Sequence, residues 1–283
     1  MATFKELIYK YTTDHSRFVV IDDMMVHYRD EGEGPPIVLL HGAFSSLQTF
    51  NEWSILLQKN YRVISLDLMG FGLTGPNSSG DYTIGNHIRV LKRFLNILNL
   101  QDCHLAGSSL GGWLAWEFTY RYPKRIKKLI LIDAAGFIDK ESMPLPFKLA
   151  QSPLAGRVLK YVVRKSILEQ FVKQVYYDIS KINQKLVDRY FDLFTREGNS
   201  KAFIDLVNAP FQDNTHFLRK IEQQTLIMWG KEDAWISVAH AHLFYKMLPN
   251  AILKIYPNVG HLPMEEIPSI SGNDLLSFLN QEA

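Results

Sequence analysis

The sequence predicts an α/β fold in which helices cover both faces of a doubly wound, mostly parallel sheet of about eight strands. Two observations indicate this fold. Short apolar runs, which lack polar alternation and are therefore typical of strands covered on both faces, are separated by segments with helical periodicity. The alternation stops between Asp133 and Thr225, where only helical patterns occur, so we expect an inserted helical cap there.

The predicted strands begin with an antiparallel hairpin. It pairs Phe18–Ile21 with Met24–Arg29 and turns at Asp22 and Asp23, whose short acidic side chains suit turn positions. Later apolar runs are expected to be strands that are buried on both faces. These runs are Ile37–Leu40, Tyr61–Leu66, Cys103–Ala106, Leu129–Ile132, Thr225–Trp229 and Ile252–Tyr256.

Helices are predicted between these strands and in the cap. Residues 84–98 place apolar side chains on one face, and Leu110–Tyr122 stops before Pro123. Such alternation of strand and helix favours right-handed crossovers. In the cap, Ser152–Tyr177 has helical spacing. The predicted domains are a cap of residues 137–213 and a core of residues 1–136 and 214–283.

The cap is predicted to be basic. Between Lys148 and Lys185 the chain carries eight basic and two acidic residues, a local charge of +6. The simplest interpretation is a solvated outer face of a small helical subdomain. Weak contact with an anionic membrane surface is the alternative.

Composition limits the class of protein. With 283 residues, 47% hydrophobic residues, 21% charged residues and a net charge of +2, the chain resembles an ordinary globular enzyme and not a nucleic-acid-binding protein. No run approaches the roughly 18 apolar residues of a transmembrane helix. The N-terminal residues lack a signal-like apolar stretch, so a cytoplasmic protein is expected. We expect it to be a monomer or a homodimer. The only cysteine, Cys103, is expected to pack in a strand.

Residues 107–111 read Gly-Ser-Ser-Leu-Gly and match the pattern G-x-S-x-G, with Ser109 at its centre. The pattern lies between a predicted strand and a predicted helix, where the two glycines permit a sharp turn that exposes the serine hydroxyl. A glycine-rich turn without chemistry is the simpler explanation of the pattern alone. Its position, and the partners described next, favour Ser109 as a nucleophile.

Two further residues are predicted to activate Ser109, because a serine hydroxyl needs a base to remove its proton. His261 follows the last predicted strand, at the sheet edge where catalytic groups of open α/β sheets gather, and is the predicted base. Asp233, on the loop after Thr225–Trp229, is predicted to orient the imidazole. Glu232 on the same loop and Asp133 at another strand end remain alternatives.

Attack on a carbonyl carbon creates an oxyanion, which two backbone N–H groups are expected to stabilise. One belongs to Leu110; the other lies in the loop after the first buried strand, where Ala43 is preferred and Phe44 is the alternative. His41 is expected to brace that loop. The candidate substrate-binding residues are Phe44, Ser108, Trp235 and Leu262. Apolar residues available to line a pocket are Leu145, Phe147, Leu154, Phe171, Tyr176, Phe211 and Trp235.

Together these residues resemble the α/β-hydrolase superfamily, which uses the chain order of Ser109, Asp233 and His261. Residues 67–74, Asp-Leu-Met-Gly-Phe-Gly-Leu-Thr, are similar to the D-x-x-G-x-G-x-S segment common there, and Asp67 is expected to bind backbone N–H groups. Gly-His-Leu-Pro at residues 260–263 resembles the loop around the family's histidine. The resemblance spans nearly the whole chain and implies a serine esterase or lipase with a helical cap.

The predicted activity is cleavage of a small-molecule carboxylic ester through an acyl-enzyme on Ser109. Carbon–carbon bond hydrolases of ring-fission products are an alternative within the superfamily, but they usually have tryptophan directly after the histidine, where this chain has Leu262. A catalytically silent receptor for a small ligand is the alternative outside enzymes. No cofactor or metal ion is expected, because the chain has no H-E-x-x-H string and no cysteine cluster.

Overall fold

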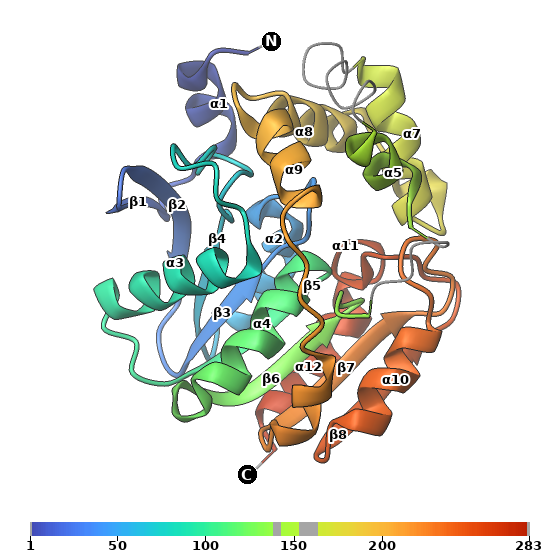
Figure 1. Cartoon of the computed structure of the whole chain (residues 1–283). Helices are drawn as coiled ribbons and strands as arrows, with labels where there is room; N and C mark the ends of the chain where they lie inside the picture. Colours follow the sequence, from blue (N-terminus) through green and yellow to red (C-terminus); the bar gives the residue numbers. More distant parts are fainter. Residues whose placement is uncertain (1, 138–142, 153–163, 282–283) are drawn as a thin grey trace.

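The computed structural model describes residues 2–137, 143–152 and 164–281 (Figure 1). At its centre is an eight-stranded sheet with the strand order β1-β2-β4-β3-β5-β6-β7-β8. The strands are Ser16–Ile21 (β1), Met24–Glu31 (β2), Pro36–Leu40 (β3), Arg62–Leu66 (β4), Cys103–Ser108 (β5), Ile126–Ile132 (β6), Gln224–Gly230 (β7) and Ala251–Tyr256 (β8). The predicted fold class is confirmed, and every predicted strand is present with slightly different ends.

The sheet is antiparallel only at its beginning. β1 pairs with β2 and β2 with β4 in antiparallel fashion, whereas all other pairs are parallel. The hairpin pairs Ile21 with Met24, and Asp22 in its turn has a φ of 55°, which aspartate tolerates better than most residues. The central parallel strands are almost entirely buried, as their continuous apolar runs predict.

The last strand, β8, corrects one prediction. We expected Ile252–Tyr256 to be covered on both faces, but burial alternates along β8 and Ile252 is 40% exposed. The physical reason is its position at the edge of the sheet, where it pairs only with β7. α10 packs against β8, and the side chains that point away from this contact reach solvent.

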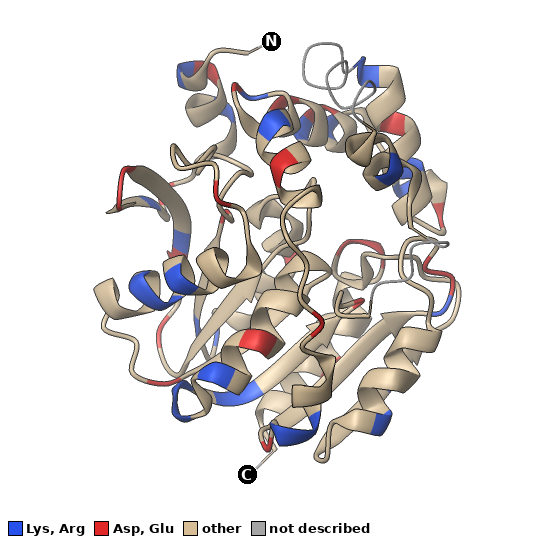
Figure 2. Ribbon diagram, viewed as in Figure 1, with Lys and Arg blue, Asp and Glu red and all other residues tan. Residues whose placement is uncertain are grey.

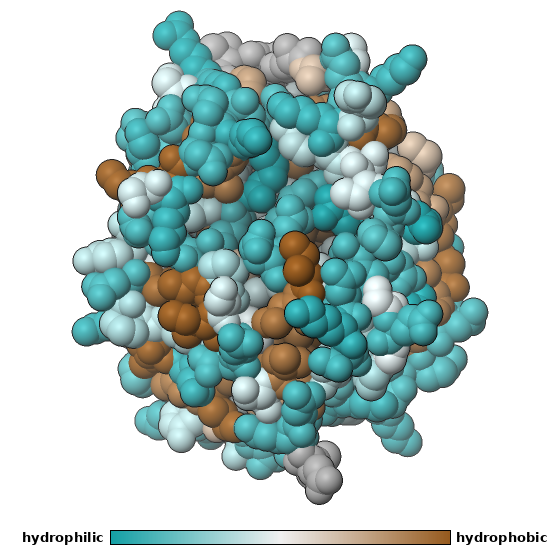
Figure 3. Space-filling view, turned by 180° about the vertical axis from the view of Figure 1, so that it is seen from behind, coloured by the Kyte–Doolittle hydropathy of each residue, from teal (hydrophilic) through white to brown (hydrophobic). Residues whose placement is uncertain are grey.

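Helices cover both faces of the sheet (Figure 1). One face carries α3 (Ile84–Ile97), α4 (Leu110–Arg121) and α10 (Ala239–Met247), and the other carries α2 (Asn51–Leu57), α11 (Pro263–Glu266) and α12 (Pro268–Leu279). α1 (Phe4–Tyr11) precedes the sheet. Short 3-10 helices span Leu47–Phe50, Pro123–Arg125, Ile179–Lys181 and Thr215–Lys220. Seen from behind, the surface is mostly hydrophilic with separate apolar groups between the polar ones (Figure 3).

Between β6 and β7 the described chain is helical. It forms α5 (Leu145–Gln151), α7 (Lys165–Val175), α8 (Gln184–Phe194) and α9 (Asn199–Val207), which lie above the carboxyl ends of the parallel strands (Figure 1). Of the helix predicted over Ser152–Tyr177, the described part contains α7, whereas Ser152 has an extended backbone after α5 and residues 153–163 lie outside the described part. The division into a core and a cap at residues 137 and 213 stays a prediction.

Figure 2 shows the described basic residues of this segment on α5, on α7 and on the chain around α8. Arg157 and Lys160, which belong to the predicted basic stretch, lie outside the described residues. Several of the described basic residues have partners within the protein: Lys165 pairs with Asp188, Lys173 pairs with Glu169, and Lys181 donates to the backbone carbonyl of Glu266. These contacts reduce the charge that is free to attract an anionic surface. Over the described residues, no helix combines the length and the apolar character needed to cross a bilayer.

Candidate active site

Ser109 lies at a sharp turn between β5 and α4. Its backbone has φ 52° and ψ −115°, a combination that residues other than glycine rarely adopt. The N–H of Ser109 donates to the carbonyl of Ile132 at 3.0 Å, and its carbonyl accepts from the N–H groups of Trp113 and Ala135. Bonds from β6, from α4 and from the chain after β6 therefore hold the strained turn in place.

The glycines on either side of Ser109 are required by close packing. A Cβ atom at Gly107 would lie 2.1 Å from the carbonyl oxygen of Gly111. A Cβ atom at Gly111 would lie 2.2 Å from the carbonyl oxygen of Leu40. Strand, turn and helix thus approach so closely that no side chain fits at either position.

His261 and Asp233 form a buried pair. His261 lies in the histidine loop, residues 257–262, which connects β8 to α11, and its Nδ1 is 2.7 Å from Oδ2 of Asp233. The other oxygen, Oδ1, accepts hydrogen bonds from the N–H groups of Trp235 and Ile236 at 2.7 and 3.0 Å. Asp233 can therefore fix the imidazole through Nδ1, which leaves Nε2 free for proton transfer.

The two alternative acids have other partners. Glu232 accepts a hydrogen bond from the N–H of Val259 at 3.2 Å, so it supports the histidine loop. Asp133 is fully buried, and its Oδ1 accepts from the N–H of Gly230 at 2.9 Å. Burial, reinforced by the negative charge of Asp233, raises the pKa of Asp133 well above its ordinary value of 3.8. Asp133 is thus suited to hold a proton beside an ionised Asp233.

Asp133, Asp233 and His261 each place a ligand atom within 4.8 Å of the others, which raises the question of a cation site. Oδ2 of Asp233 and Nδ1 of His261 are already bonded to each other. Metal ligands must be deprotonated, and the raised pKa of Asp133 opposes this. The cluster therefore fits a histidine supported by carboxyl groups better than it fits a metal site.

Two residues have the structural roles that the sequence predicted. Nε2 of His41 accepts a hydrogen bond from the N–H of Leu68 at 2.9 Å, which braces the loop after β3. The carboxylate of Asp67 accepts from the N–H groups of Leu47 and Leu73, each at 2.8 Å. Both predictions are confirmed by these bonds. Neither residue lines a cavity beside Ser109.

The expected oxyanion donors lie next to Ser109. Ala43 lines both cavities described below, and Phe44 lines the smaller one. Leu110 is the first residue of α4, so its N–H belongs to the group that has no acceptor within the helix. These positions suit the predicted oxyanion hole, whose donors stay a prediction.

Ser109 lies between two cavities. The large cavity has a volume of about 510 Å³ and extends between the sheet edge and helices α5 and α9. The small cavity has a volume of about 30 Å³ and lies against α7 and the histidine loop. His261 lines the small cavity together with Ser109. The four candidate substrate-binding residues, Phe44, Ser108, Trp235 and Leu262, all line the small cavity, and Trp235 also lines the large one.

Only some of the apolar residues that the sequence suggested as pocket lining line a cavity beside Ser109. Phe147, Phe211 and Trp235 line the large cavity, and Phe171 with Trp235 lines the small one. Leu145 lines neither, because it lies at the start of α5 and is 52% exposed. Tyr176 also lines neither, since its hydroxyl donates to Glu265 at 2.6 Å. Leu154 lies outside the described residues.

Sequence patterns missed a buried ionic cluster around Glu265 of α11. Arg189 of α8 donates to both oxygens of Glu265 at 2.7 and 2.8 Å. The hydroxyls of Tyr176 and Tyr190 donate to the same carboxylate. The available signal was a pair of adjacent carboxylates shortly after the histidine, which would need partners wherever the fold buries them.

The neighbouring Glu266 ties the histidine loop to the chain after α7. Its carboxylate accepts hydrogen bonds from the N–H groups of Gly260, Tyr177 and Asp178. The N–H of His261 itself donates to the carbonyl of Val175, the last residue of α7, at 2.8 Å. The helical segment therefore contributes directly to the position of His261.

Residues 35–268 match the family model of the alpha/beta hydrolase fold. The chain is 26% identical to 2-hydroxy-6-oxo-6-(2'-aminophenyl)hexa-2,4-dienoic acid hydrolase of Metapseudomonas resinovorans, over 94% of this chain and 91% of that protein. It is 29% identical to 2-hydroxy-6-oxononadienedioate/2-hydroxy-6-oxononatrienedioate hydrolase of Paraburkholderia phymatum, over 92% of each. The structure of a candidate lipase from Acinetobacter baumannii superposes with a TM-score of 0.83 and 27% identity, over 99% of this chain and 96% of that one. This chain therefore belongs to the α/β-hydrolase fold family and is a hydrolase.

Proposed function

We propose that this hydrolase cleaves uncharged carboxylic esters through an acyl-enzyme on Ser109. The observation that carries the proposal is the place of Ser109, at a strained turn between a large apolar cavity and a small cavity that His261 also lines. The bond from Nδ1 of His261 to Asp233 supports a base role for the imidazole.

In the proposed acylation, Oγ of Ser109 forms a bond to the ester carbonyl carbon while Nε2 of His261 takes the hydroxyl proton. The N–H groups of Ala43 and Leu110 stabilise the oxyanion. The bond to the alcohol oxygen then breaks, and His261 gives its proton to that oxygen. Water next attacks the acyl carbon and loses a proton to His261, which returns it to Ser109 as the acid leaves.

The charge of the described side chains that line the two cavities favours an uncharged ester over a negatively charged ring-fission product. The substrates named for the two curated relatives are carboxylic acids, and burying a carboxylate requires a cation or several hydrogen-bond donors. The described residues around the large cavity include the polar side chains of Gln151, Asn208 and His240, but those around either cavity include no lysine or arginine. Arg189 of α8 is engaged by both oxygens of Glu265.

Carbon–carbon bond hydrolysis is the second candidate, and the names of the curated relatives favour it. It would use the same serine, histidine and aspartate. Leu262, which follows the histidine where those enzymes usually have tryptophan, argues for the ester. Disappearance of the absorbance of 2-hydroxy-6-oxo-6-phenylhexa-2,4-dienoate, without turnover of esters, would favour this candidate instead.

The proposed function is tested by labelling and turnover together. A fluorophosphonate probe should modify Ser109, and titration of released acid should show turnover of methyl octanoate. Ser109→Ala should abolish both, because the nucleophile is removed. Ser269→Ala, which changes an exposed serine of α12, is the matched control and should retain both. Full turnover by the Ser109→Ala variant would contradict the proposal.

A further inference from the structure

We infer that the preferred esters join a long or bulky apolar acid to a very small alcohol, and this inference rests on the proposed function. It comes from the unequal size of the two cavities at Ser109, which are about 510 Å³ and about 30 Å³. An ester bonded to Ser109 must extend into both cavities. The two halves of the substrate therefore meet very different limits on size.

The chemistry decides which half enters which cavity. His261 must give a proton to the alcohol oxygen as that oxygen leaves, so the alcohol has to lie beside the imidazole. His261 and Leu262 line the small cavity. The described residues around the large cavity include none from the histidine loop. The alcohol therefore occupies the small cavity, and the acyl chain occupies the large one.

The small cavity has firm walls. Phe44 and three residues of α7, Leu168, Phe171 and Val172, line it, and all four side chains are buried. The rings of Phe44 and Phe171 are 6.4 Å apart between centroids. Since one water needs about 10 to 15 Å³ on this measure, the cavity accepts a group the size of methanol or ethanol. A butyl or benzyl group would have to displace these side chains.

The small cavity also offers polar contacts for the second half of the reaction. Oγ of Ser108 is buried and has no hydrogen-bond partner in the described part of the chain. Ser108 is one of the residues that line the cavity together with His261. Once the alcohol has left with its proton, water can take its place, bond to Ser108 and lose a proton to His261 as it attacks the acyl carbon.

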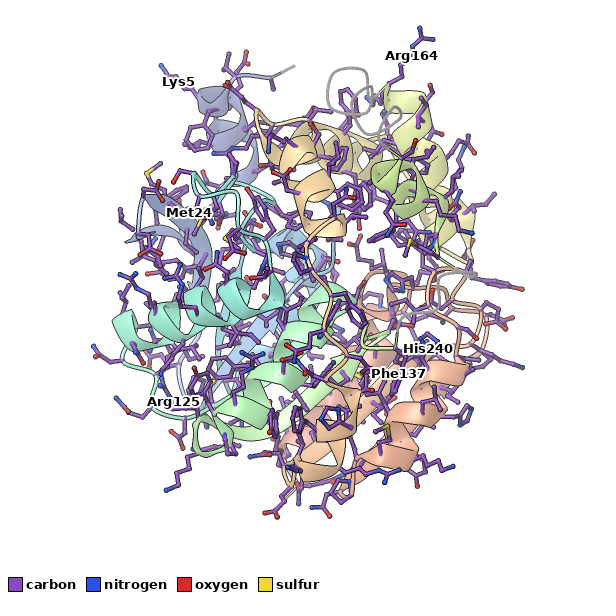
Figure 4. All side chains as sticks on the ribbon, viewed as in Figure 1. Lys5, Met24, Arg125, Phe137, Arg164 and His240 are labelled. Atoms are coloured by element: carbon purple, nitrogen blue, oxygen red, sulfur yellow. The ribbon has the colours of Figure 1, made fainter. Side chains whose placement is uncertain are left out.

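The large cavity is suited to an apolar chain. Its walls include Phe147 of α5 and the aromatic pair Trp113 and Phe211, whose rings pack edge to face with centroids 5.5 Å apart. Phe137 and His240, which lie side by side in Figure 4, line the wall nearest α10. These aromatic walls bind hydrocarbon without requiring charge or many hydrogen bonds.

The test measures kcat/KM for the methyl, ethyl, butyl and benzyl esters of octanoic acid, each by titration of the released acid. We expect the methyl ester to exceed the butyl and benzyl esters by about tenfold or more, in the range that pocket size typically imposes. Methyl octanoate should also exceed methyl acetate. Equal rates for the methyl and benzyl octanoates would overturn the inference and leave the proposed function intact. Absence of turnover of every ester would overturn both.

Variants assign the effect to the small cavity. Phe171→Ala enlarges that cavity and should reduce the preference for methyl over butyl octanoate by about fivefold or more. Phe211→Ala is the matched control, because Phe211 lines only the large cavity and is 47% exposed. It should leave the alcohol preference unchanged and alter the acyl preference. Leu168→Ala serves the same purpose if Phe171→Ala does not fold. An unchanged methyl-to-butyl ratio in a folded small-cavity variant would overturn the inference.

Discussion

Asp133 and Asp233 show how two buried carboxyl groups acquire different roles within one cluster. Asp233 is bonded through both oxygens, to His261 and to two backbone N–H groups, so its negative charge is well supported. Oδ1 of Asp133 accepts from the N–H of Gly230, and burial together with the charge and a side-chain hydrogen bond of Asp233 raises the pKa of Asp133. A single buried cluster can hold both carboxyl groups if only one of them is ionised.

This difference predicts unequal effects on activity. Asp233→Asn should lower kcat by about 10³- to 10⁴-fold, because the amide favours the wrong imidazole tautomer. Asp133→Asn should lower kcat by less than about tenfold, since it replaces a neutral group with another neutral group. Turnover of methyl octanoate by the two purified variants checks this. Equal losses would contradict the assignment of Asp233 as the ionised partner of His261.

The raised pKa of Asp133 predicts a pH dependence of stability. The native state binds the Asp133 proton more tightly than the unfolded chain does, so protonation of Asp133 stabilises the native state. This stabilisation is complete below the ordinary pKa of 3.8 and is lost as the pH rises toward the raised pKa. In the Asp133→Asn variant the side chain cannot ionise, so no stability is lost in this way. The variant should therefore gain stability relative to the wild type from pH 4 to pH 8. Urea unfolding at a series of pH values measures the difference.

Asp213→Asn is the control for this titration. Hydrogen bonds from Thr215 lower the pKa of Asp213, so ionised Asp213 stabilises the native state. This stabilisation is present above the ordinary pKa and is lost as the pH falls. The relative stability of this variant should therefore change in the opposite direction and over a lower pH range. A pH-independent stability difference for Asp133→Asn would contradict protonation of Asp133 in the native state.

At the scale of elements, the junction of β5 and α4 depends on the two glycines beside Ser109. We predict that Gly107→Ala lowers the free energy of unfolding by about 3 kcal/mol or more, because its Cβ would collide with backbone atoms that cannot move independently. Gly85→Ala in α3 is the control. Its Cβ would meet nothing closer than 3.9 Å, and alanine should stabilise the helix by up to about 1 kcal/mol. Chemical denaturation of both variants provides the comparison.

The contact between α8 and α11 is the other decisive junction of elements. Arg189 and Glu265 are 14% and 9% exposed, so removal of one charge leaves the other buried without its partner. Glu265→Gln should therefore lower the free energy of unfolding by about 3 to 5 kcal/mol. Glu169→Gln, which breaks the exposed pair with Lys173, should cost no more than about 0.5 kcal/mol. Similar costs for the two variants in urea denaturation would contradict a buried, coupled pair.

At the scale of the whole molecule, the helical segment and the sheet share one apolar core. Phe171 of α7, Tyr190 of α8 and Phe203 of α9 belong to the same buried cluster as Leu40 and Leu131 of the sheet. We predict that the segment and the sheet unfold together. Far-ultraviolet circular dichroism and tryptophan fluorescence should give one coincident urea transition. Separate transitions would indicate that the segment unfolds independently.

The parts of the molecule that the sequence predicted are those encoded by short stretches of chain. Apolar runs located the strands, and five residues around Ser109 located the turn. The local pattern could not show that β8 lies at an edge, because exposure depends on strand order. It could not show the tie from Glu265 to Arg189 or the sizes of the two cavities either. These features depend on side chains brought together from distant parts of the chain.

The hydrogen bond from His261 to the carbonyl of Val175 has a consequence for protein engineering. The helical segment cannot be exchanged without consequence for the core, because the last residue of α7 supplies a backbone anchor for His261. A chimera that exchanges residues 137–213 must present a carbonyl at the position of Val175 and amides at those of Tyr177 and Asp178. Donor segments should accordingly be selected by the backbone that follows this helix before they are selected by the side chains that face the substrate.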